Sequence, residues 1–344
     1  MIDLHAHVVL PDVMGRAGKY GPELFREADG TPGFRVGEYR LVGVPYEGTP
    51  FMELSLRVEA MDAAGIEIQV LSPNPLTYFH HIEAPVAAEF CKWHNDSMAE
   101  AVSLYPTRLA GFAQLPVQDP ALAAQELERS VTKLGLVGAY FGTDLAGGLH
   151  SPAMDELWAM ATALDVPVFL HPGPHGIDGP PGDERLREWG LDLYLGFAFE
   201  ESLAVSQLLF GGVLDRHPLL DCSVSHGGGA TAWLMERMEI AAQTRPGIEE
   251  ALRKPGAVRA RLRRLWWDAH VGGEAARRFL METMGSERLL PGTNFCGWDS
   301  GHSLVDAHTG DEQPDGAIHD HTPTELDLTE LLDANARRVL RNRI

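Results

Sequence analysis

Histidines in this sequence stand at positions where metal chemistry is expected. His5 and His7 are two residues apart in Asp-Leu-His-Ala-His, so on a strand both side chains point to the same face. Further histidines follow other apolar runs: His171 after Val-Phe-Leu, His226 after Cys-Ser-Val-Ser, and His270 after Trp-Trp-Asp-Ala. Neutral imidazole binds divalent zinc, iron, manganese and cobalt. One such histidine indicates little, but the repeated placement predicts a metal site.

The elements that would position these histidines alternate regularly along the chain. Short apolar runs predict buried parallel strands, and amphipathic stretches between them predict helices. Eight such units predict an α/β fold, a (β/α)8 TIM barrel formed as one domain by residues 1–344, with a doubly wound sheet as the alternative. The predicted strands are Ile2–His7, Ile66–Leu71, Leu109–Leu115, Leu136–Phe141, Val168–His171, Asp221–His226, Leu265–His270 and Leu289–Thr293. A barrel brings the carboxyl ends of these strands into one circle.

Three stretches are too long to be simple turns, at about residues 8–50, 172–199 and 294–328. Each follows a predicted strand, so each is expected to emerge at the carboxyl-terminal face, where barrel enzymes have their active sites. Long insertions at this face usually form lids and substrate pockets.

Composition limits the class of protein. The chain has 344 residues, 44% of them hydrophobic, which is enough for a large core. Its net charge of −21 argues against nucleic acid or an anionic membrane as a partner. No segment approaches the ~20 apolar residues of a membrane span, and three widely separated cysteines form no disulfide framework. We expect a cytoplasmic protein acting on a small molecule; a homodimer is compatible with the sequence.

Several motifs resemble the amidohydrolase superfamily, and within it the branch that includes aminocarboxymuconate semialdehyde decarboxylase. The resemblance covers most of the chain, and its motifs are DLHAH (3–7), FLHPG (169–173), GGVLDRHPLLDCSVSHGGG (211–229) and LLPGTN (289–294). It implies that His5, His7 and His171 bind a metal. It also implies that His226 is either a ligand of a second metal or an acid–base residue.

The sequence departs from that family at Asn294, where the family carries an aspartate. An amide cannot act as a carboxylate base near neutral pH. Asp299, five residues later, is a candidate to replace the carboxylate in catalysis, and His270 adds a nitrogen ligand. Such a nitrogen-rich site favours redox chemistry: two iron ions activating O2. The expected metal ligands are His5, His7, His171, His226, His270 and Asn294.

The stretch Thr-Asn-Phe-Cys-Gly-Trp-Asp (293–299) resembles a smaller group of barrel proteins, similar to the non-haem diiron monooxygenase of platensimycin biosynthesis. This resemblance implies a monooxygenase that hydroxylates a bulky, apolar acyl coenzyme A thioester in secondary metabolism, such as antibiotic biosynthesis. The alternative is a zinc- or manganese-dependent nonoxidative decarboxylase or hydrolase, with His226 as the acid–base residue. A binding protein without catalytic activity is a third reading.

Basic residues gather before the seventh predicted strand, and they include Arg259, Arg261 and Arg263. Arginine pairs bidentately with phosphate, so we predict that these three side chains bind the phosphates of coenzyme A. A solvated helical face is the alternative.

Overall fold

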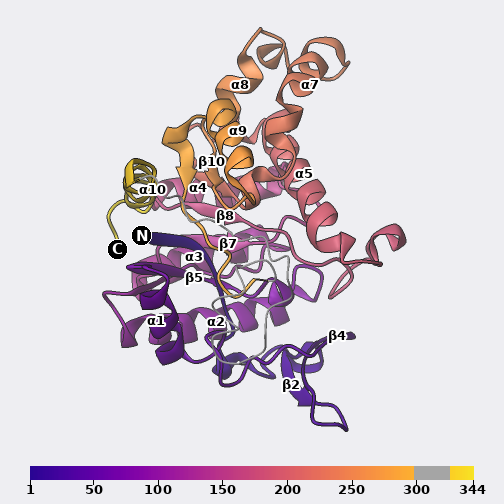
Figure 1. Ribbon diagram of the computed structural model, residues 1–344. Coiled ribbons are helices and arrows are strands. Elements are labelled where there is room, and N and C mark those ends of the chain that lie inside the picture. Colours follow the sequence, from indigo (N-terminus) through magenta and orange to yellow (C-terminus); the bar gives the residue numbers. More distant parts are fainter. Residues whose placement is uncertain (298–325) are drawn as a thin grey trace.

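The structure is a computed structural model, and it describes residues 1–297 and 326–344. Eight parallel strands form a barrel, and each is followed by a helix on the outside (Figure 1). The barrel strands are β1 (Ile2–Val8), β5 (Ile68–Pro73), β6 (Leu109–Gly111), β7 (Ala139–Phe141), β8 (Val168–Leu170), β9 (Cys222–Val224), β10 (Trp266–Asp268) and β11 (Leu289–Leu290).

Two seams close the barrel between strands that share only part of a ladder. At the β6–β7 seam, the Val137 amide donates to the Gly111 carbonyl at 3.0 Å, and a parallel bridge joins residues 113 and 139. At the β11–β1 seam, the Leu4 amide donates to the Pro291 carbonyl at 3.0 Å, and that of Phe295 donates to the His5 carbonyl at 3.2 Å. The predicted TIM barrel is confirmed.

Local sequence explains where helices begin and end, as in the third one. The Asp119 carboxylate accepts a hydrogen bond from the Leu122 amide, and the left-handed Gly135 follows the last turn. No helix in the described parts of the chain is long and apolar enough to cross a membrane. The helices are α1 (Leu54–Ala63), α2 (Ala84–Leu104), α3 (Pro120–Leu134), α4 (Asp155–Ala163), α5 (Phe197–Phe210), α6 (Val213–Arg216), α7 (Thr231–Thr244), α8 (Ala257–Leu262), α9 (Glu274–Met284) and α10 (Leu326–Val339).

Three strands that precede site histidines are shorter than predicted at their carboxyl ends. β8, β9 and β10 end before His171, His226 and His270, which lie one or two residues further along the chain. These histidines therefore belong to the loops at the carboxyl-terminal face, although the barrel still fixes where each loop begins.

The insertions contain structure that the sequence patterns did not reveal. A small antiparallel sheet, β2 (Glu23–Arg26), β3 (Pro32–Val36) and β4 (Tyr39–Val42), lies within residues 8–50. Residues 172–199 include a π-helical turn, Asp192–Gly196, that leads directly into α5. Both segments extend over the same side of the barrel in Figure 1.

Aromatic side chains fill the inside of the barrel. Tyr140 and Phe169, from the neighbouring strands β7 and β8, stack with ring centroids 4.9 Å apart and are fully buried. Phe112 and Trp266 belong to the same buried cluster. This rigid core supports the residues that follow the strands.

Candidate metal centre

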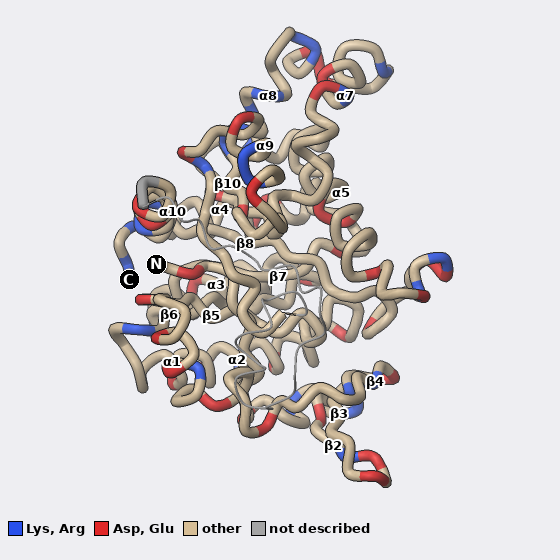
Figure 2. Tube along the Cα trace, in the orientation of Figure 1, with Lys and Arg blue, Asp and Glu red and all other residues tan. Residues whose placement is uncertain are grey.

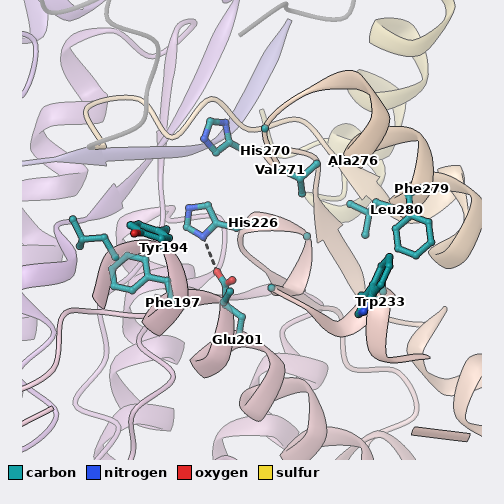
Figure 3. Close-up of a pocket in the computed structure, with 16 residues that line it drawn as sticks. Tyr194, Phe197, Glu201, His226, Trp233, His270, Val271, Ala276, Phe279 and Leu280 are labelled. Carbon is teal, nitrogen blue, oxygen red and sulfur yellow. Dashed lines mark hydrogen bonds and ion pairs between the residues drawn. The ribbon is translucent and has the colours of Figure 1, made fainter. Parts of the chain in front are cut away.

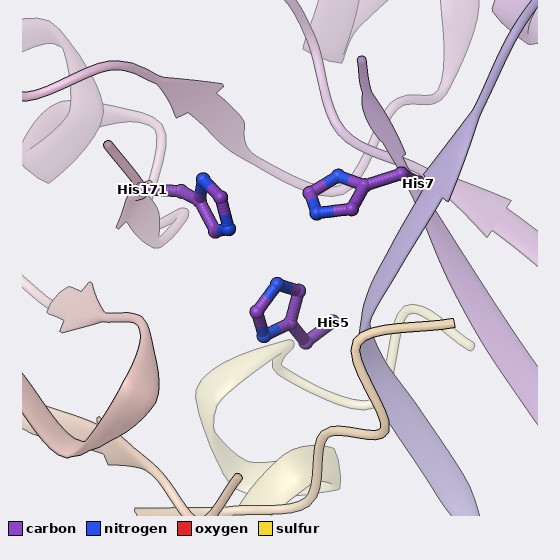
Figure 4. A group of neighbouring side chains, drawn as sticks. All are labelled: His5, His7 and His171. Atoms are coloured by element: carbon purple, nitrogen blue, oxygen red, sulfur yellow. The ribbon is translucent and has the colours of Figure 1, made fainter. Parts of the chain in front are cut away.

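Three histidines converge at the carboxyl end of the barrel. His5, His7 and His171, called here the three-histidine cluster, each offer a ring nitrogen, and these nitrogens lie within 4.8 Å of one another. The side chains are buried, and Figure 4 shows the rings facing a common point. The structure thus brings together two residues of β1 and one that follows β8.

Hydrogen bonds define which nitrogen of each ring carries a lone pair. His5 Nδ1 lies 2.7 Å from the Asp268 carboxylate, and His171 Nδ1 lies 2.6 Å from the carbonyl of the next residue. His7 Nδ1 lies 3.3 Å from the carbonyl of Pro73. A nitrogen beside such an acceptor carries the proton, so Nε2 carries the lone pair in each ring. This is the tautomer that a metal ligand requires.

Burial favours the neutral form of His7 and of His171. It lowers the pKa of His7 to about 3, and it places the pKa of His171 well below its usual value. Nε2 of His171 is buried and has no hydrogen-bond partner within the described residues. A buried polar atom without a partner is costly, and a bound cation would satisfy it. The donor set therefore fits a divalent metal.

Two features of the barrel orient the histidine rings of the cluster. β1 contains a bulge between Asp3 and Ala6, just where the two histidines begin, and bulges beside active sites re-aim side chains. Below the cluster, Tyr140 lies 5.8 Å from the His171 ring and Phe169 lies 5.8 Å from the His5 ring, between centroids. The rings are thus packed against the aromatic barrel core.

Asp268, at the end of β10, connects three of the predicted site residues. Besides its contact with His5 Nδ1, it accepts backbone N–H bonds from His226 and His270, each at 3.0 Å. Its side chain is buried, and burial raises its pKa. A carboxylate that holds the far nitrogen of a ligand histidine fixes the ring orientation and increases its basicity. Asp268 therefore positions the His5 ring and is not one of the candidate metal ligands.

His226 lies beside the cluster and has a carboxylate partner of its own. Its Nδ1 is 2.6 Å from Glu201 on α5, which also accepts a hydrogen bond from the Ser225 hydroxyl (Figure 3). Glu201 is fully buried, and burial raises its pKa. The His226 ring centroid lies 5.1 Å from that of His171. An imidazole held at Nδ1 by a carboxylate is suited to carrying a proton at Nε2.

The backbone is strained at two site positions. His226 has φ 44° and Asn294 has φ 50°, values uncommon for residues other than glycine. Such strain is concentrated at functional sites. The Asn294 side chain is buried and hydrogen-bonds the His7 ring, so the amide is adjacent to the cluster.

Two other predicted site residues have different placements. His270 is buried, with its ring centroid 5.9 Å from that of His226 and 6.1 Å from that of His5. Its ring therefore lies next to both His226 and His5. Asp299 lies outside the described residues.

Two cavities open on either side of the site. The first cavity, of about 420 Å³, is lined by His7, His171 and Asn294 together with residues of the first insertion such as Tyr46. The second cavity, of about 390 Å³, is lined by His226 and His270 and by apolar residues of α7 and α9 (Figure 3). Leu193 and Phe197 border both cavities.

The three arginines predicted to bind phosphate lie elsewhere. Arg259 pairs with Glu236 at 2.5 Å, Arg261 pairs with Asp215 at 2.9 Å, and Arg263 donates to a backbone carbonyl. Figure 2 shows acidic residues interspersed with the basic ones around α7 and α8. None of the three lines either cavity as the described residues form them. Their partners within the described residues are acidic side chains and a backbone carbonyl.

A second group of histidines and carboxylates was not predicted as a unit. His81 and His175 lie 3.0 and 3.3 Å from Asp144, and the other nitrogen of His175 lies 3.1 Å from Glu200. This loop network joins the segments that follow β5, β7 and β8 to α5. The Pro-Gly-rich loop sequence around His175 gave no signal for it, because the contacts depend on how the loops fold.

Several known proteins similar to this chain are decarboxylases. A 2-amino-3-carboxymuconate-6-semialdehyde decarboxylase from Dictyostelium discoideum is 28% identical over 302 residues, which cover 86% of this chain and 81% of the relative. A gamma-resorcylate decarboxylase from Polaromonas sp. is 35% identical over 195 residues, 53% of this chain and 58% of the relative. A crystal structure of a dihydroxybenzoic acid decarboxylase from Polaromonas sp. JS666, with bound manganese and the inhibitor 2-nitroresorcinol, has a TM-score of 0.71 at 23% identity, covering 100% of this chain and 97% of that chain.

These relatives correct the predicted activity. The predicted iron-dependent monooxygenase, with its hydroxylation chemistry and its role in antibiotic biosynthesis, is wrong, because the relatives are nonoxidative decarboxylases. The resemblance to a diiron monooxygenase is not shown, and neither iron with O2 nor an acyl thioester is supported. The error came from Asn294: a missing base excludes one way of activating water, but it does not by itself indicate redox chemistry.

The family relationship extends over almost the whole chain. The amidohydrolase family model (Amidohydro_2) matches residues 2–341, which include every member of the three-histidine cluster. The predicted superfamily and its decarboxylase branch are therefore confirmed. This chain belongs to the amidohydrolase family.

Proposed function

We propose that this protein is a metal-dependent nonoxidative decarboxylase acting on a small organic acid, and that it uses manganese or zinc. The observation that carries the proposal is the three-histidine cluster with the His226–Glu201 pair beside it. The relatives support the reaction class, and the manganese in a structural neighbour supports the metal.

In this proposal, the ligands are the Nε2 atoms of His5, His7 and His171. A metal held there supplies a Lewis acid that binds and polarises the oxygens of the substrate. The buried, neutral rings and the aromatic core below them exclude water from that side of the site. Asp268 keeps the His5 ring in its required orientation.

His226 provides the proton that decarboxylation consumes. The carbon bearing the carboxylate receives a proton, the bond to the carboxylate breaks, its electron pair stays on that carbon, and CO2 leaves. Glu201, held in place by Ser225, orients the His226 ring and stabilises its protonated form. The substrate carboxylate is thus replaced by hydrogen, with no oxidant or reductant.

Asn294 is compatible with decarboxylation. Hydrolysis in a metal barrel needs a base that deprotonates water, and an amide cannot serve as one. Decarboxylation needs a proton donor instead, so an amide hydrogen-bonded to His7 is compatible with it.

The test is CO2 release by the manganese-loaded protein without oxygen. Dihydroxybenzoates, which are named for similar proteins, and aryl carboxylates with larger ring systems are the first acids to assay. We expect CO2 release in equal amount with the decarboxylated product under nitrogen. His226→Asn should reduce turnover by about 10²–10⁴-fold without loss of metal. His217→Asn is the matched control, because His217 pairs with Asp155 away from the site. Turnover that requires O2 would contradict the proposal.

A further inference from the structure

The positions of the candidate metal ligands and the proton donor relative to the two cavities constrain the substrate. His7 and His171 line the first cavity, whereas His226 lines the second. A substrate must reach both the metal and the proton donor. Its reacting carbon must therefore lie at the boundary between the cavities, beside Phe197.

Phe197 marks that boundary. Its ring centroid lies 5.8 Å from that of His171 and 6.3 Å from that of His226. Phe197 is buried at the start of α5, directly after the π-helical turn. Groups attached to the reacting carbon thus extend to either side of this ring, one into each cavity.

The second cavity is shaped for an apolar group. Its far wall consists of Trp233 on α7 and Phe279 on α9, whose ring centroids are 6.1 Å apart, together with the aliphatic Val271 and Leu280 (Figure 3). Trp233 is 76% exposed and Phe279 is 41% exposed. Large aromatic side chains left this exposed at the edge of a cavity indicate a surface that a ligand covers. A cavity of this size accommodates more than a small substituent.

The described cavity linings lack the basic residues that a substrate with several anionic groups would need. No lysine or arginine is among the described residues that line either cavity. The segment 298–325, which the structure does not describe, contains no lysine or arginine in its sequence. Among the described residues that line the two cavities, Glu201 is the only one with a carboxylate, and it is hydrogen-bonded to His226. A second carboxylate or a phosphate would thus be desolvated without a lysine or arginine partner.

We infer that the substrate is a monocarboxylate whose uncharged apolar body is larger than one aromatic ring and extends past Phe197 into the Trp233–Phe279 cavity. The inference rests on the proposed function, because the metal defines where the carboxylate binds. It assigns the second cavity, and Ala276 and Phe279 within it, to substrate specificity.

Three acids serve as probes of the manganese-loaded protein in calorimetric titrations. Benzoate carries one ring and one carboxylate, biphenyl-4-carboxylate adds an apolar ring, and isophthalate adds a second carboxylate. We expect biphenyl-4-carboxylate to bind at least about tenfold more tightly than benzoate, because the added ring is desolvated in the cavity. Isophthalate should bind no more tightly than benzoate.

A pair of variants localises the effect. Ala276 lines the second cavity and Ala275, its neighbour on α9, does not; both are exposed, so tryptophan is tolerated at either position. Ala276→Trp should fill the cavity and remove the advantage of biphenyl-4-carboxylate while leaving benzoate binding unchanged. Ala275→Trp should keep the advantage.

The possible results distinguish a failure of the substrate inference from a failure of the proposed function. Equal affinities for the two monocarboxylates, an advantage that survives Ala276→Trp, or preference for isophthalate would overturn the inference. Acids that bind metal-free protein as well as the loaded protein would refute the metal-bound carboxylate of the proposed function. In that case, the affinities of biphenyl-4-carboxylate and isophthalate relative to benzoate would still test the inference about the substrate.

Discussion

Two groups of histidines at the same end of the barrel have opposite chemistry. The three-histidine cluster is buried against aromatic rings, and burial lowers the pKa of His7 and of His171. In the loop network, hydrogen bonds that His175 donates to Asp144 and Glu200 raise the pKa of His175 to about 10. His175 lies only four residues after His171. The comparison shows that surroundings, rather than residue type or chain position, decide whether a histidine is a neutral ligand or a cation in an ion pair.

The largest expected effect is the loss of bound metal when a histidine of the three-histidine cluster, rather than one of the loop network, is replaced. His171→Ala removes one of three ligands and should abolish manganese binding and activity, with the barrel still folded. His175→Ala is the matched control and should retain one manganese per chain. Elemental analysis after dialysis and far-UV circular dichroism measure both properties. Full metal content in His171→Ala would refute the ligand assignment.

Asp268 is expected to have the next largest effect. Its carboxylate holds His5 at Nδ1, and loss of such a partner typically lowers metal affinity by about 10–100-fold. Asp268→Asn keeps the size of the side chain but removes the charge and one of the two acceptor oxygens, so it keeps only one of the backbone bonds from His226 and His270. Competition titration with a fluorescent chelator gives the affinity. An unchanged value would show that Asp268 is purely structural.

Asn294→Asp would place a carboxylate beside a histidine of the buried cluster, as Asp144 lies beside His175 in the loop network. A carboxylate next to His7 adds a negative charge beside the metal, and we expect manganese to bind about tenfold more tightly. The shape of the side chain is conserved, so the packing should persist. The same chelator titration measures the change, and weaker binding would contradict the assigned position of Asn294.

The smallest effect concerns the stability contributed by the loop network. Because the folded pKa of His175 is raised from 6.5 to about 10, its stabilisation is complete below about pH 6.5 and is lost as pH rises through 10. His175→Gln should lower the free energy of unfolding by about 1 kcal/mol at pH 6, with solvent screening included. Urea titrations of both proteins at pH 6 and pH 10.5 should show the difference shrinking. A difference that is independent of pH would mean that packing, not charge, is lost.

Sequence periodicity predicted the barrel and the meeting of His5, His7 and His171, because strand order alone brings the carboxyl ends together. It did not predict the Glu201–His226 pair, because α5 and the loop after β9 come together only in the tertiary structure. The loop network was missed for the same reason: His81, Asp144 and His175 come from three different loops.

The activity was harder to predict than the fold. A single residue, Asn294, led to the redox hypothesis, although several reactions tolerate an amide at that position. Asp299, the other residue of that argument, lies outside the described residues. The family motifs specified the ligand geometry, whereas the choice of reaction depends on the proton donor and the cavities, which short motifs do not encode.

The most direct test of the metal centre is anomalous diffraction at the manganese edge from crystals of the loaded protein. Our account predicts one strong peak between the imidazole rings of His5, His7 and His171, within coordination distance of their Nε2 atoms. A peak in the loop network instead, at Asp144 and His175, or no peak in fully loaded crystals, would contradict it.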